Sequence, residues 1–107
     1  MLSVYWTPEA HKKLKEIQNY IISKDAPQAA KKVVATLLSR TRQLETFARS
    51  GRKILEYPDD DIWELLERPY RIIYRISEQQ IEILTVMHYR QLLPATVTAL
   101  KLIHENA

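Results

Sequence analysis

The sequence predicts an α+β fold in two layers, in the element order β-α-α-β-β-β(-β), with a helical hairpin packed on one face of an antiparallel sheet. Two apolar stripes with helical spacing lie in residues 7–50, and short alternating segments follow residue 51. The turns between these segments are too short for crossover connections, so neighbouring strands must be antiparallel. With 107 residues, the chain has the size of one domain, 1–107.

A short strand at 2–6 is expected to lead into the first helix. Thr7 is suited to the N-cap position and Pro8 to the first helical position. The apolar residues of this helix recur every three or four positions up to about Ser23, and they are Ala10, Leu14, Ile17 and Ile21.

A second helix follows after only a few residues. Asp25 is expected to be its N-cap, with Gln28 three positions later as in a capping box. Its apolar stripe consists of Ala30, Val34, Leu37, Thr41 and Leu44, flanked by Val33, Leu38 and Phe47. Gly51, the only glycine, is expected to end this helix in a left-handed conformation.

Four strands are expected at 53–56, 62–67, 70–76 and 81–87, and a short helix after Pro94. In the strand at 70–76, Tyr70, Ile72, Tyr74 and Ile76 share one face, while Arg71, Ile73 and Arg75 share the other. The first face is expected to pack on the helices. The predicted core contains Leu14, Ile17, Val34, Leu37, Leu44, Ile72, Tyr74 and Leu84. The other face, here called the outer face, is expected to be open and to carry the function.

Composition excludes several kinds of site. The chain has no cysteine, and its net charge of +3 is only mildly basic. Its three histidines lack ligand spacing, and the aspartates at 59–61 are typical of a turn, so we expect no metal and no cofactor. Because no leader or membrane span is recognisable, we expect a cytoplasmic protein without a membrane partner.

Three stretches carry a family resemblance: GRKILE at 51–56, ELLERPYRIIYRI at 64–76 and IEILTVMHYRQLLP at 81–94. In order and spacing they resemble the RelE/ParE superfamily, the toxins of type II toxin–antitoxin modules, also described as the plasmid stabilisation family. The resemblance covers nearly the whole chain. It implies a RelE-like fold with the first strand beside the last, and a cognate antitoxin that wraps and neutralises the toxin.

The resemblance leaves two targets open. The long helical hairpin favours a ParE-like toxin that inhibits DNA gyrase. The alternative is a RelE-like mRNA interferase, a metal-independent endoribonuclease that cleaves messenger RNA on the ribosome. A third possibility is a basic RNA- or DNA-binding domain without toxicity.

The candidate residues depend on which target is correct. Arg71 matches the strand arginine of the RNA-cleaving members, and His88 and Tyr89 resemble the terminal His-Tyr pair of one RNase subgroup. The catalytic candidates for an RNase are therefore Arg71, His88, Tyr89 and Arg90, with His88 or Glu67 as the base and Arg75 as a further cation. The residues expected to bind a target are Lys53, Arg68, Arg71, Arg75 and Arg90. Alternatively, the strand arginines pair with Glu64, Glu67 and Glu82 on neighbouring strands.

Overall fold

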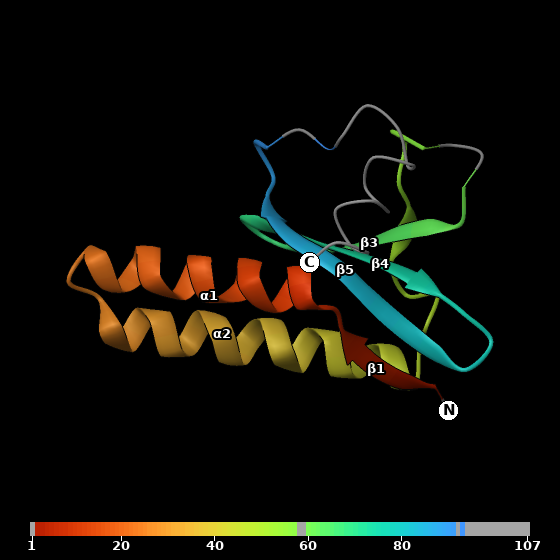
Figure 1. The fold of residues 1–107 in the computed structure, drawn as a ribbon, viewed down its shortest axis with the longest axis horizontal. Coiled ribbons are helices and arrows are strands. Elements are labelled where there is room, and N and C mark those ends of the chain that lie inside the picture. Colours follow the sequence, from red (N-terminus) through yellow and green to blue (C-terminus); the bar gives the residue numbers. More distant parts are fainter. Residues whose placement is uncertain (1, 58–59, 92, 94–107) are drawn as a thin grey trace.

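The computed structural model describes residues 2–57, 60–91 and 93. In chain order its elements are β1 (Ser3–Trp6), α1 (Pro8–Ser23), α2 (Pro27–Arg42), the 3₁₀ turn η1 (Gln43–Glu45), β2 (Arg52–Lys53), β3 (Ile62–Glu67), β4 (Tyr70–Ile76) and β5 (Gln80–His88). The strands form one sheet in the order β1-β5-β4-β3-β2, and α1 and α2 form an antiparallel hairpin that projects beyond it (Figure 1). The predicted α+β architecture is confirmed.

The sheet is antiparallel except where β1 pairs with β5, and there the two strands are parallel. The expectation that the first strand lies beside the last is therefore confirmed. Thr7 joins this edge to helix α1. Its hydroxyl accepts a hydrogen bond from the Ala10 N–H (3.1 Å) as the predicted N-cap and donates one to the Ile83 carbonyl (2.8 Å) in β5.

The predicted start of the second helix is wrong. Asp25 has a φ of 58° and Ala26 is the N-cap, without a side-chain hydrogen bond. The link between α1 and α2 is so short that one of its residues must adopt the left-handed conformation to reverse the chain. Aspartate tolerates this conformation better than most residues, so Asp25 makes the turn instead of capping the helix.

The role predicted for Gly51 is also wrong, because no described glycine has a positive φ. Its N–H donates a hydrogen bond to the Tyr74 hydroxyl (3.2 Å). A Cβ at this position would overlap the Glu64 carbonyl and lie 2.6 Å from the Tyr74 hydroxyl oxygen. Glycine is therefore required by close approach to the sheet and not by a left-handed backbone.

The strand predicted at 53–56 is shorter than expected, since β2 contains only Arg52 and Lys53. After one more backbone hydrogen bond, from the Ile54 N–H to the Ile62 carbonyl (3.1 Å), the chain leaves the sheet edge. Ile54 and Tyr57 then pack onto the outer face.

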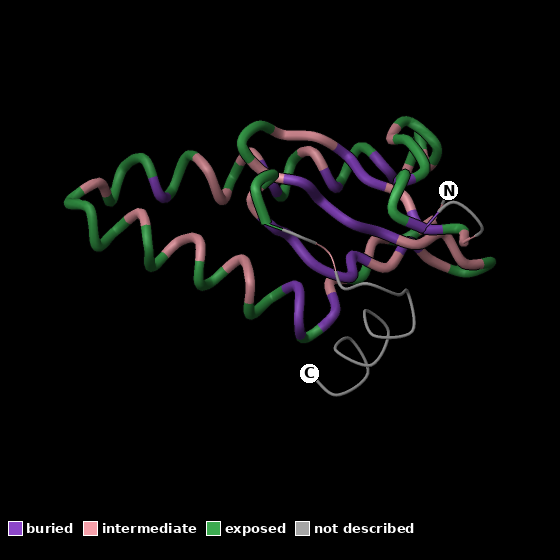
Figure 2. The backbone as a smooth tube through the Cα atoms, turned by 90° about the horizontal axis from the view of Figure 1, so that it is seen from above, coloured by how far each residue is buried: buried purple, intermediate pink, exposed green. Residues whose placement is uncertain are grey.

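Two apolar clusters lie on opposite faces of the sheet. Between helices and sheet, Leu37, Leu44, Ile72 and Tyr74 are fully buried as predicted, and Leu14 and Ile17 pack against them partly buried. The outer face is not open as expected, because a second cluster covers part of it. This cluster consists of Ile54, Tyr57, Ile62, Ile73, Leu84 and Met87, with Leu93 against it. The strands are accordingly buried along much of their length (Figure 2).

Leu84 is buried as predicted, although not between the helices and the sheet. Leu84 belongs to the outer cluster, at an irregularity where Ile73 pairs with Thr85 but Tyr74 pairs with Ile83. Phe47, expected beside the helical stripe, is 66% exposed because the chain has already left the helix there. Val34 is only partly buried.

Leu37→Ala should lower the free energy of unfolding by about 2–5 kcal/mol, because it leaves a cavity between α2 and the sheet. Leu38→Ala is the matched control, since Leu38 is 37% exposed and its loss should cost well under about 1 kcal/mol. Urea denaturation of both variants measures the difference. Equal losses would contradict the helix orientation described here.

Candidate functional site

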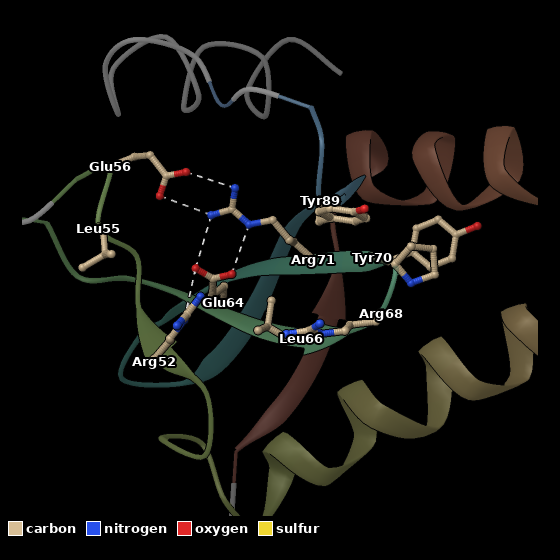
Figure 3. Close-up of a pocket in the computed structure, with 10 residues that line it drawn as sticks. Arg52, Leu55, Glu56, Glu64, Leu66, Arg68, Tyr70, Arg71 and Tyr89 are labelled. Atoms are coloured by element: carbon tan, nitrogen blue, oxygen red, sulfur yellow. Dashed lines mark hydrogen bonds and ion pairs between the residues drawn. The ribbon is translucent and has the colours of Figure 1, made fainter.

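The most conspicuous polar feature of the outer face is Arg71, whose side chain is almost completely enclosed by carboxylates. Arg71 is 8% exposed. It donates from Nε and Nη2 to the two oxygens of Glu64 (3.0 and 3.2 Å) and from Nη1 and Nη2 to the two oxygens of Glu56 (3.0 and 3.2 Å). Figure 3 shows this double fork. Bidentate arginine–carboxylate pairs are among the stronger hydrogen-bonded contacts in proteins.

Three different segments meet at this point. Arg71 lies on β4 and Glu64 on the neighbouring strand β3, so both side chains point to the outer face. Glu56 arrives from the segment that follows β2 and folds across the sheet. Arg52 adds a second cation, with its Nε 3.5 Å from Glu64. We call these four residues the Arg71 cluster, and their formal charges cancel.

Within the cluster, Arg71 and its carboxylate partners stabilise each other in their ionised forms. The hydrogen bond from Arg71 lowers the pKa of Glu56, against an opposing contribution from burial. Burial alone would lower the pKa of Arg71, but the hydrogen bonds to Glu56 and Glu64 outweigh it and raise that pKa. Arg71 thus remains charged while most of its donors are already occupied.

A hollow of about 670 Å³ opens beside the cluster (Figure 3). Its lining residues are Arg52, Leu55, Glu56, Glu64, Leu66, Arg68, Pro69, Tyr70, Arg71 and Tyr89. Leu55 is 83% exposed and Tyr89 is about half exposed, so the walls present apolar surface to water. Such surface is a common feature of binding sites.

The structure does not bring all of the RNase candidates together. Arg71 and Tyr89 line the same hollow. His88 is paired in register with Tyr70, and the two rings meet edge to face at 6.2 Å. Tyr70 packs against the core under the helices, whereas Arg71, the next residue, points to the opposite face. His88 therefore does not line the hollow itself but lies behind Tyr70 and Tyr89, which do.

Local contacts fix His88, Tyr89 and Arg90 relative to one another. The His88 and Tyr89 rings stack with centroids 4.7 Å apart. The Arg90 backbone N–H donates to His88 Nδ1 (3.1 Å), and Arg90 Nε donates to the Tyr89 hydroxyl (3.0 Å). His88 Nδ1 is thus occupied by a hydrogen bond within this stretch.

The remaining candidates are mostly engaged in ion pairs. Arg75 pairs with Glu82 (2.7 Å) and Lys53 with Asp61 (3.6 Å). Glu67, the alternative base, pairs with Arg40 of α2 (3.1 Å). The cross-strand pairing that the sequence left open is thus observed for Arg71 with Glu64 and for Arg75 with Glu82.

Arg68 and Arg90 differ from the other predicted target-binding residues in their ion pairing. Within residues 2–57, 60–91 and 93, neither Arg68 nor Arg90 forms an ion pair with a carboxylate. Both are exposed, and both lie at or next to the hollow, Arg68 in its wall and Arg90 in contact with Tyr89. Among the described residues, they are the cations of this site that have no carboxylate partner.

Sequence reasoning did not identify Glu56 or Leu55 as part of the site. Both were assigned to a regular strand, where they would point to opposite faces. The available signal was the proline at 58 so soon after GRKILE, since proline is unfavourable within a sheet and favours an early departure from it.

Other kinds of site find no support in the described part of the chain. No three histidine, aspartate or glutamate side chains there are arranged to hold a metal ion. None of the helices that the structure describes has the length and apolarity to cross a membrane. The helix predicted after Pro94, like Asp59 of the acidic turn, lies outside the described residues.

Comparisons with known proteins agree with this architecture. Residues 4–93 match the family model of the ParE toxin of the type II toxin–antitoxin system parDE. The chain is 41% identical over 91 residues to Y4kP, a candidate toxin of Sinorhizobium fredii, covering 85% of this chain and 92% of that protein. A chain from the chromosomal ParDE system of P. aeruginosa superposes with a TM-score of 0.69 at 26% identity, covering 82% and 96% of the two chains.

The Arg71 cluster makes stability depend on pH through Glu56. Because the folded-state pKa of Glu56 lies below its ordinary value of 4.5, its ionised form stabilises the fold above about that pH and this contribution is lost as pH falls through the lower folded value. The stability difference between wild type and Glu56→Gln should therefore shrink on acidification below about pH 4.5. Urea denaturation at a series of pH values measures it.

Glu78→Gln is the control, because Glu78 is exposed in the turn between β4 and β5 and forms no ion pair with a described residue. Its effect should stay small throughout the same pH series. A difference for Glu56→Gln that stays constant from neutral pH to pH 3 would contradict the ion pair with Arg71.

Proposed function

This chain belongs to the ParE toxin family of type II toxin–antitoxin systems, and on that premise we propose that it inhibits DNA gyrase by binding to it, without catalysing a reaction. Such a system includes a cognate ParD antitoxin, which is the chain's partner until the toxin is released. The proposed target requires the toxin to act in the cytoplasm.

The observation that carries this proposal is the pairing of Arg71 with two glutamates. An enzyme that cleaves RNA must place cations on the scissile phosphate and a base on the 2′-hydroxyl. Arg71 already donates four hydrogen bonds to Glu56 and Glu64, and those carboxylates would repel a phosphate. His88, the first candidate base, does not line the hollow, and its ring is stacked on that of Tyr89.

Inhibition by binding requires fewer specifically placed groups than RNA cleavage does. Inhibition by binding needs complementary shape and charge, and tyrosine and arginine are the residue types that contribute most often to such interfaces. Tyr89, Arg68 and Arg90 supply these types at one end of the sheet. Of the predicted target-binding cations, we therefore expect Arg68 and Arg90 to contribute more than Lys53, Arg71 or Arg75, which are held in ion pairs.

Purified toxin should inhibit the supercoiling of relaxed plasmid by gyrase. The double variant Arg68→Gln/Arg90→Gln should need roughly tenfold more protein for the same inhibition, which corresponds to about 1.4 kcal/mol of binding free energy. Lys12→Gln is the control, because it removes an exposed charge from α1 and should leave inhibition unchanged.

The same protein tests the alternative function when it is added to translating ribosomes. No new cuts should appear in the messages. Codon-specific cleavage that His88→Ala abolishes, with supercoiling unaffected, would contradict the proposal and identify a RelE-like mRNA interferase.

A further inference from the structure

We propose that the hollow beside Arg71 is the seat for one anchor of the cognate antitoxin, namely a large apolar side chain next to a carboxylate. This inference rests on the family membership that gives the chain an antitoxin, and it does not depend on gyrase being the target. Three properties of the hollow support it: its apolar walls, its cations without a carboxylate partner among the described residues, and its rigid construction.

The apolar walls are incompletely covered by the described residues. Leu55 is 83% exposed, although it follows a buried isoleucine, and Leu66, Pro69 and Tyr89 lie around the same space. The outer cluster fills the neighbouring part of this face but leaves the hollow empty of its own side chains. An inserted apolar side chain would remove these walls from water, as anchors at the centre of protein interfaces do.

The charges next to the walls specify the second part of the anchor. Glu56 and Glu64 are bound to Arg71, so the hollow presents no free acid. Arg68 and Arg90, by contrast, lack a carboxylate partner among the described residues. A carboxylate beside the apolar anchor would pair with one of them, which gives the site a preference for an acidic segment.

The same pattern makes a nucleic acid a poorer occupant. A nucleic acid carries one negative charge per nucleotide, whereas the hollow offers only two cations without a carboxylate partner among the described residues, next to the acidic side chain of Glu56, which is 42% exposed. Leu55, Leu66 and Pro69 offer nothing to bind a phosphate, and only Tyr70 and Tyr89 of the lining residues carry rings on which a base could stack. A peptide with one apolar and one acidic side chain satisfies both the walls and the cations.

Arg71 gives this site its rigidity and is in this sense a positioning residue. By binding both oxygens of Glu56, it holds the segment after β2 against the sheet, and Leu55 is the adjacent residue. A wall that is already fixed loses little conformational freedom when the partner binds. The cluster thus fixes the shape of the hollow before the partner binds.

The test is the affinity of the purified toxin for the antitoxin encoded by the adjoining gene, measured by isothermal titration calorimetry. Leu55→Asp should weaken binding at least tenfold, since it places a charge in the apolar wall beside a carboxylate-bearing anchor. Leu55→Met, which keeps the wall apolar, should bind within about threefold of wild type. Phe47→Asp is the matched control, because Phe47 is 66% exposed but does not line the hollow, and its affinity should be unchanged.

Circular dichroism of each variant verifies folding, which Leu55→Asp should preserve because the side chain is exposed. A folded Leu55→Asp variant that binds antitoxin like wild type would overturn the proposal. So would binding of a labelled single-stranded oligonucleotide that Leu55→Asp abolishes while antitoxin binding persists, because the hollow would then serve a nucleic acid. The assay contains no gyrase, so failure in the supercoiling experiment does not affect its outcome.

Discussion

The double fork between Arg71 and the carboxylates of Glu64 and Glu56 organises the outer face of the sheet. Glu64 is buried, and an ionised carboxylate in that position requires a cation with good hydrogen-bond geometry. Arg71 satisfies this requirement, and its remaining donors fasten Glu56. The segment after β2 is thereby fixed across the sheet, where Ile54 and Tyr57 complete the outer cluster and Leu55 becomes the wall of the hollow.

This arrangement gives Arg71 a structural role, in place of the catalytic one considered from the sequence. The resemblance implied an arginine that lies against a phosphate in an RNA-cleaving toxin, whereas here Arg71 is enclosed by two carboxylates. Function depends on the site and not on the fold, and acidic residues around a cation change what that cation can bind. The cations without a carboxylate partner among the described residues, Arg68 and Arg90, lie at the edge of the hollow, where a protein partner can reach them.

Much of the fold was predictable because strong periodic patterns determine it. The stripe through Leu37 and Leu44 and the alternation along β4 gave the correct layers. The errors arose where several local solutions fit the same residues: Asp25 both caps helices and tolerates a left-handed turn, and the apolar run containing Leu84 does not define which face each residue occupies. The partnership of Arg71 with Glu64 was one of two open alternatives, but that with Glu56 was not predictable from strand pairing, because Glu56 is outside the sheet.

The most direct test of a structural role for Arg71 is a comparison of Arg71→Met with the double variant Arg71→Met/Glu64→Leu. The single change leaves Glu64 buried without its main partner and should destabilise the protein by about 3–5 kcal/mol. The double change replaces the buried pair with apolar side chains, so it should recover most of that stability and still inhibit the growth of a bacterial host. A double variant that is stably folded but no longer inhibits growth would contradict this account, because it would show that Arg71 itself acts on the target.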